Sequence, residues 1–142
     1  MSLRVVFDTS TLVSAARRPA SIPEQALQFA ILFYQLYVST ETLAELERVL
    51  RLKKFDRYVR LDSRMEFVYK LRRDALPCFV PGKALDEVRG FCRDAKDDIF
   101  LALCMTAHAD ILVSSDQDLL VLDPWRGIAI LPPAQFLRQF SA

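Results

Sequence analysis

Acidic residues concentrate in one stretch of this sequence, where a helical pattern gives way to a strand pattern. Residues 94–123 contain seven Asp and a single Lys. Asp97 and Asp98 open an apolar helical run, whereas Asp116 and Asp118 follow the short apolar run 111–113. Carboxylates gathered at the ends of elements repel one another unless a cation or protons compensate them. The stretch therefore predicts a cation site.

Two further acids lie much earlier in the chain. Asp8 directly follows the apolar run 3–7, and Glu45 lies in a helical pattern near the rim of its apolar stripe. Glu41 and Glu47 are alternatives to Glu45, but they lean more toward solvent in that pattern. Ligands of parallel sheets bind at the carboxyl ends of strands, so these acids are expected to meet there.

Taken singly, each of these carboxylates has a structural explanation as a helix cap or an Asx turn. Taken together, they form a set of oxygen ligands without His or Cys, which selects a hard ion such as Mg²⁺ or Mn²⁺. Such ions keep several waters, leaving positions for phosphate oxygens and an activated water. The chemistry this predicts is metal-assisted hydrolysis of a phosphodiester.

A basic segment in the middle of the chain supplies a second signal. Phe55 and Tyr58 are interleaved with its cations, a composition suited to phosphate contacts and base stacking. The alternative is an ordinary solvated surface. The candidate nucleic-acid-binding residues are Arg51, Lys53, Lys54, Arg57 and Arg60.

Other chemistries are excluded by what the sequence lacks. Three glycines provide neither a P-loop nor a dinucleotide fingerprint. The lone His108 argues against zinc and against a His-activated nucleophile. Cys78, Cys92 and Cys104 show no CxxC spacing and lie in apolar surroundings, which favours free thiols in a reducing cytoplasm. No targeting segment or membrane-spanning stretch is expected.

The length suits one domain, residues 1–142, in which strand and helix patterns alternate. This alternation predicts an α/β fold with a mainly parallel sheet of four to five short strands and helices on both faces. The expected strands are 3–7, 37–39, 78–80, 110–113 and 128–131. The expected helices are 12–16, 22–34, one beginning at Thr40, one capped by Asp62 or Ser63 and ending near 76, one over about 97–109, and 134–139.

Four motifs resemble those of a known family. They are VVFDTSTLVSA at 5–15, STETLAELERVL at 39–50, CRDAKDDIFLALC at 92–104 and ADILVSSDQDLL at 109–120. Together with a final strand and a proline-led helix, they make the chain similar to a PIN-domain nuclease of the VapC-like toxin type. The resemblance covers nearly the whole length and implies the three-layer PIN-like fold.

The resemblance also implies a metal-dependent ribonuclease with an acidic quartet. Matching each motif by position gives Asp8, Glu45, Asp98 and Asp116. Asp8, Asp98 and Asp116 would hold the metal, while Glu45 would position it or orient the attacking water. Asp97 would lie nearer the helix cap. The supporting residues would be Asp97, Asp118, Ser114 and Ser10, the last standing where the family commonly has Asn.

The same resemblance implies an antitoxin protein as partner and a homodimer or higher oligomer. Two other functions remain open at this point. One is a PIN nuclease acting in RNA processing or on DNA flaps rather than as a toxin. The other is a catalytically inactive module that binds RNA or a protein.

Overall fold

The computed structural model describes residues 2–141, in which short strands alternate with helices. The strands are β1 (Arg4–Phe7), β2 (Gln35–Val38), β3 (Leu76–Pro77), β4 (Ile111–Val113) and β5 (Ala129–Leu131). The helices are α1 (Thr9–Arg17), α2 (Ile22–Phe33), α3 (Thr40–Leu50), α4 (Leu61–Asp74), α5 (Gly82–Val88), α6 (Asp98–Ala107), α7 (Gln117–Leu120) and α8 (Pro133–Phe140). Two 3₁₀ turns, η1 (Lys53–Phe55) and η2 (Ala95–Asp97), precede α4 and α6.

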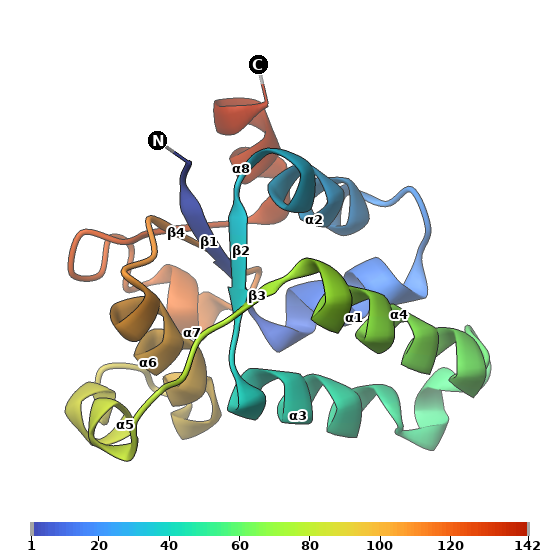
Figure 1. Cartoon of the computed structure of the whole chain (residues 1–142), viewed down its shortest axis with the longest axis horizontal. Coiled ribbons are helices and arrows are strands. Elements are labelled where there is room, and N and C mark those ends of the chain that lie inside the picture. Colours follow the sequence, from blue (N-terminus) through green and yellow to red (C-terminus); the bar gives the residue numbers. More distant parts are fainter. Residues whose placement is uncertain (1, 142) are drawn as a thin grey trace.

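The five strands form one parallel sheet in the order β3-β2-β1-β4-β5. β1 pairs with β2 on one side and with β4 on the other, so the carboxyl ends of all three strands lie at the same edge (Figure 1). The expected α/β class and parallel sheet are confirmed. Among residues 2–141, no helix is long and apolar enough to cross a membrane.

Each face of the sheet carries its own core, because side chains alternate along a strand. Val5 and Phe7 pack into one core with α1, α2, α3, α4 and α8, where Phe136 is fully buried. Val6, between them, belongs to the other core with α5, α6 and α7. These two cores make the three layers of the fold, and burial on both faces explains why the strands are apolar runs.

The third strand and the fourth helix differ from the expected boundaries. β3 is Leu76–Pro77 rather than 78–80. The N–H of Cys78 still donates to the carbonyl of Val38 in β2, at 2.8 Å, but the strand ends before this residue. The strand lies at the sheet edge, where proline is tolerated. α4 begins at Leu61 without a side-chain cap, so neither Asp62 nor Ser63 caps it. The short helices α5 and α7 were not expected from the sequence.

Candidate metal-binding site

Asp8 lies at the carboxyl end of β1 and begins α1. Its side chain caps the helix by accepting a hydrogen bond from the N–H of Thr11 at 3.0 Å. The Ser10 hydroxyl donates to both carboxylate oxygens, at 3.2 and 3.1 Å. Burial raises the pKa of Asp8, and these hydrogen bonds, with one from Ser114, oppose the increase. The cap and the site explanations are thus compatible, because one carboxylate serves both.

Ser114 links Asp8 to Asp116 across two strands. Its hydroxyl, at the carboxyl end of β4, donates to the Asp8 carboxylate at 2.6 Å and accepts from the backbone N–H of Asp116 at 3.0 Å. Asp116 then caps α7 by accepting from the N–H of Asp118 at 2.9 Å. Because β1 and β4 are paired neighbours, residues 106 positions apart form one polar cluster.

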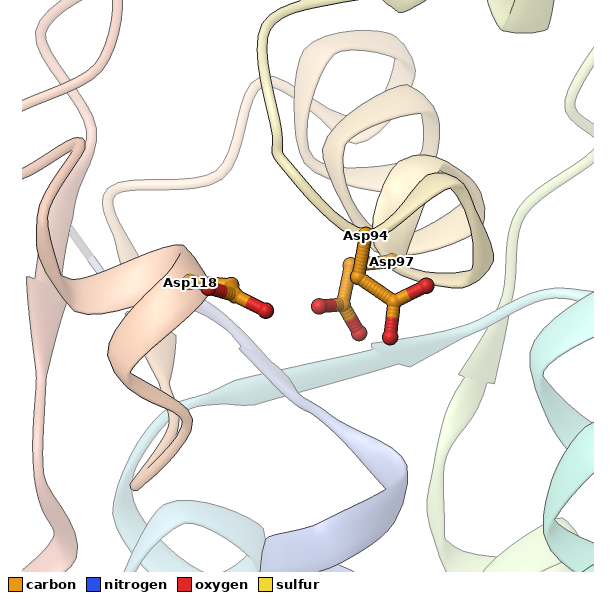
Figure 2. A group of neighbouring side chains, drawn as sticks. All are labelled: Asp94, Asp97 and Asp118. Carbon is orange, nitrogen blue, oxygen red and sulfur yellow. The ribbon is translucent and has the colours of Figure 1, made fainter.

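Asp97, in the η2 turn before α6, also faces this cluster. Its carboxylate lies with those of Asp94 and Asp118 in a group whose ligand atoms are all within 4.8 Å of one another (Figure 2). Burial and the neighbouring carboxylates of Asp116, Asp94 and Asp8, which repel its charge, together raise the pKa of Asp97 to about 7. Asp97 is therefore the group in which the mutual repulsion of the acids is concentrated.

The thiol of Cys92 contacts the Asp97 side chain. Burial raises the pKa of its thiol to about 11, so the thiol stays protonated at neutral pH. It lies 3.6 Å from the Asp97 carboxylate and 3.4 Å from the backbone carbonyl of Asp118. The three cysteines are free, and Cys104 is fully buried in α6.

Asp98 occupies a different position from the expected one. It is the first residue of α6, 5% exposed, and does not line the cleft that contains Asp8, Asp97 and Asp116. Burial raises its pKa, while the charge of Arg89 lowers it. Asp97 is at the N-cap, as expected, but makes no capping hydrogen bond and turns into the cleft instead. The two adjacent acids thus point to different surroundings, and only Asp97 joins the cluster.

Glu45 reaches the same cleft from α3. A capping box begins that helix: Ser39 accepts from the N–H of Thr42, whose hydroxyl accepts from the N–H of Ser39. Glu45, one turn further on, lines the cleft and forms an ion pair with Arg48 at 2.7 Å. Glu47 instead pairs with Arg51, away from the acids.

The cleft has a volume of about 400 Å³ and combines anionic and cationic walls. Its cations are Arg17 at the end of α1, Lys54 in η1 and Lys96 in η2. Within residues 2–141, none of these three forms an ion pair, although eight other arginines and a lysine do. The acids are consequently faced by positive charges that are not neutralised by the protein itself.

The five cations of the basic segment have different surroundings in the structure. Arg51 pairs with Glu47 at 3.0 Å, and Arg60 pairs with Asp62 at 3.1 Å. Lys53 and Arg57 are exposed outside the cleft lining, so Lys54 is the member of the predicted set that lies beside the acids. Its neighbour Phe55 is only 7% exposed and is packed in the core rather than offered to a base.

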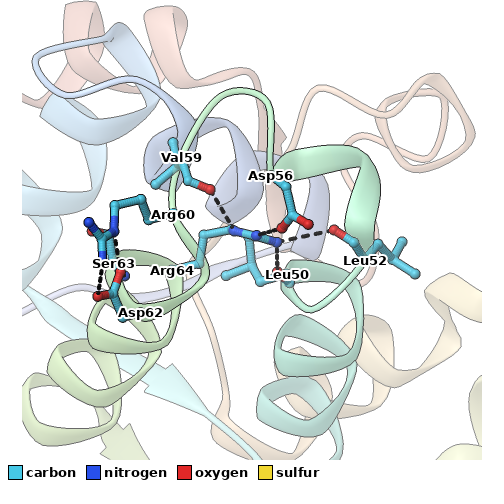
Figure 3. A network of polar contacts seen from close by, with 8 residues as sticks. All are labelled: Leu50, Leu52, Asp56, Val59, Arg60, Asp62, Ser63 and Arg64. Atoms are coloured by element: carbon cyan, nitrogen blue, oxygen red, sulfur yellow. Dashed lines mark hydrogen bonds and ion pairs between the residues drawn. The ribbon is translucent and has the colours of Figure 1, made fainter.

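Arg64 organises the segment and was missed from the sequence (Figure 3). It is 1% exposed in α4 and donates to the carbonyls of Leu50, Leu52 and Val59, and to Asp56. A signal was present, because Arg64 shares the buried helical stripe of Val68 and Leu71. A buried guanidinium with several acceptors fixes the course of the loop that it spans.

The donor set fits a hard divalent cation. The acids around the cleft offer only carboxylate oxygens, and their repulsion raises the pKa of Asp97. A cation between them would compensate that repulsion and favour the ionised form. Asp8, Glu45, Asp94, Asp97 and Asp116 line the cleft, and Asp94, Asp97 and Asp118 form the group whose carboxylate oxygens lie close enough together to share one ion.

These observations define a three-layer α/β domain with an acidic cleft at the carboxyl edge of its parallel sheet. A family model described as the PIN domain matches residues 4–118. The chain therefore belongs to the PIN-domain family, as its motifs predicted. Among curated proteins, no relative matches it significantly.

Solved structures show the same fold at low sequence identity. PAE2754 from Pyrobaculum aerophilum matches with 17% identity and a TM-score of 0.68, over 99% of this chain and 91% of that one. VapBC2 from Rickettsia felis, bound to a promoter DNA fragment, matches with 15% identity and a TM-score of 0.66, over 90% and 97%. VapC20 from Mycobacterium tuberculosis, a toxin that cleaves the sarcin-ricin loop, matches with 12% identity and a TM-score of 0.59, over 88% and 98%.

Proposed function

We propose that this protein is an endoribonuclease that depends on Mg²⁺ or Mn²⁺ and acts as the toxin of a toxin-antitoxin pair in the cytoplasm. The observation that carries the proposal is the cluster of Asp8, Asp97 and Asp116, which three separate segments bring to one cleft beside unpaired cations. Membership of the PIN-domain family supports it. The VapC toxins among the solved structures support the toxin role.

Each acid has a distinct part in this function. Asp8, Asp97 and Asp116 would hold the cation, with Asp97 in the position that Asp98 was expected to take. Ser114 and Ser10 orient the Asp8 carboxylate through their hydrogen bonds. Glu45, on the wall formed by α3, would orient the attacking water. When bound, a divalent ion activates that water and stabilises the charge that develops on the phosphate oxygens.

The positively charged side chains that line the cleft suit a polyanionic substrate. A scissile phosphate placed against the acids requires positive charge nearby, because carboxylates alone would repel it. Arg17, Lys54 and Lys96 all line the cleft, which is too small for more than a short part of a strand. These charges support a nucleic acid as the substrate.

The complexes among the solved structures suggest the partners. VapBC2 is a two-component assembly on promoter DNA, and FitAcB from Neisseria gonorrhoeae matches with 18% identity and a TM-score of 0.61. We infer an antitoxin partner and a homodimer or higher oligomer by analogy with these assemblies. Expression of the chain alone should arrest growth, and co-expression of the product of an adjacent small gene should relieve the arrest.

Cleavage of total cellular RNA tests the activity directly. The wild-type protein should cut RNA with Mg²⁺ or Mn²⁺ and stop when EDTA is added. Asp8→Asn and Asp97→Asn should lose activity by at least about a hundredfold, as expected when a group that stabilises the transition state is removed. Asp86→Asn, on the exposed face of α5, is the matched control and should retain full activity.

The comparison between adjacent acids gives the sharpest result. Asp97→Asn should abolish cleavage while a folded Asp98→Asn retains most of it, because only Asp97 lines the cleft. The reverse order would restore Asp98 as the metal ligand. Activity that is unaffected by chelation, or equal in wild type and Asp8→Asn, would refute the proposed function.

A further inference from the structure

Two cations of the cleft are each held against an aromatic ring. The guanidinium of Arg17 lies over the ring of Tyr58, 4.5 Å from its centroid, and the ammonium of Lys54 lies over Phe55 at 5.2 Å. Both cations line the cleft of Asp8, Asp97 and Asp116. Cation–π contacts restrict the cations without neutralising their charge. The rings of Phe55 and Tyr58 therefore hold positive charge beside the acids.

The rest of the basic segment is already compensated or lies elsewhere. Arg51 and Arg60 pair with Glu47 and Asp62, and neither lines the cleft. By contrast, Arg17 and Lys54 have no acidic partner within residues 2–141, and the buried Nε of Arg17 has no hydrogen-bond acceptor there. A charge restrained beside the acids but left without a counter-ion is suited to bind an incoming anion.

The two cations come from different elements, and the protein holds these elements together. Arg17 is the last residue of α1, whose N-cap is Asp8. Lys54 lies in the loop that Arg64 fixes through its bonds to Leu50 and Leu52 (Figure 3). The Arg17–Tyr58 contact joins helix and loop.

We propose that Arg17 and Lys54 bind the backbone phosphates of the substrate strand beside the acids, and that Tyr58 is a positioning residue for Arg17. This assignment rests on the proposed function, whose substrate is RNA. It narrows the predicted basic set to one of its five members and adds Arg17, which the sequence did not single out. Arg51 and Arg60 are outside the binding site.

RNA binding without cleavage tests the assignment. The probe is a short fluorescein-labelled single-stranded RNA, and its anisotropy is titrated in EDTA at several salt concentrations. Two phosphate contacts contribute a slope of about 1.4 to the logarithmic salt dependence of single-strand binding. Arg17→Gln/Lys54→Gln should thus bind about 25-fold more weakly at about 0.1 M salt, with a slope smaller by that amount.

The matched control is Arg51→Gln/Arg60→Gln, which removes the same two charges from ion-paired positions. It should bind within about twofold of wild type, because its cations already have counter-ions. Tyr58→Leu should weaken binding about two- to fivefold, the equivalent of one cation–π contact, whereas Tyr58→Phe should bind as wild type. This rescue by a ring without the hydroxyl distinguishes positioning from general structural damage.

The outcomes separate the assignment from the proposed function. Equal weakening by the two double variants, or none by Arg17→Gln/Lys54→Gln, would overturn the assignment while leaving the nuclease intact. Wild-type protein that binds the RNA through Arg17 and Lys54 but never cleaves it with Mg²⁺ or Mn²⁺ would overturn the nuclease and keep the assignment. Absence of wild-type binding would overturn both.

Discussion

Replacing Asp97 by Asn should stabilise the protein in the absence of metal. The pKa of Asp97 is raised from 3.8 to about 7 by burial and by the carboxylates of Asp116, Asp94 and Asp8. Between these two values the folded state keeps a proton that the unfolded state has lost. Raising the pH through this window therefore favours unfolding, and the whole loss is present above about pH 7.

The pKa difference sets the upper limit of the effect. A difference of about three pKa units corresponds to about 4 kcal/mol at 1.36 kcal/mol per unit. Asp97 is partly exposed and shares the repulsion with its neighbours, so solvent screening reduces the expected value to about 1–2 kcal/mol. Asn has nearly the same shape but carries no charge, so it removes the repulsion without emptying space.

Urea unfolding in EDTA at about pH 4 and about pH 8 measures this prediction. At about pH 8, wild type should have a lower free energy of unfolding than Asp97→Asn. At about pH 4, the two free energies should be nearly equal. Mg²⁺ should stabilise wild type more than the variant, because metal that binds only the folded state adds to its stability. Asp86→Asn, which changes an exposed carboxylate, should follow wild type. An Asp97→Asn protein no more stable than wild type at about pH 8 would refute the account of acid repulsion.

Three further substitutions test the structure around the cleft. Arg64→Met should lower the free energy of unfolding by about 2–4 kcal/mol in urea titrations, since several acceptors lose their donor; a loss no larger than that of the exposed Arg60→Met would contradict this. Ser114→Ala should lower the free energy of unfolding by about 1–2 kcal/mol, because the Asp8 carboxylate loses a hydrogen bond. The same loss should raise the pKa of Asp8 further, so the acid limb of the pH–rate profile should move to higher pH. Ser115→Ala should leave the profile unchanged. Phe136→Ala should cost about 3–5 kcal/mol, because the side chain is fully buried; a thermal midpoint within a degree or two of wild type would disprove its role in the core.

Much of the fold was predictable because strands buried on both faces must be apolar runs. The runs that became β1, β4 and β5 have this composition, and each is followed by residues that turn the chain. β3 was misplaced because a two-residue edge strand that contains proline has no such pattern. α7 is a single turn, too short for helical periodicity to reveal.

The acids of the site were identifiable from their types and from the elements that they follow. Their convergence also follows from the rule that parallel strands end at one edge. The sequence likewise contained the unusual position of Arg64 on an apolar stripe, but three of its four partners are backbone carbonyls, which cannot be recognised from residue types.

The sequence by itself determined the parallel α/β class, the family and the set of acids from which the site is built. Only the tertiary structure decided which of two adjacent acids enters the cleft, since the 3₁₀ turn before α6 changes the direction of Asp97 relative to Asp98. The tertiary structure also decided which cations remain free of counter-ions. The sequence specifies the charges and their spacing, but the direction of each acidic side chain and the ion pairing of each cation arise only when distant segments pack together.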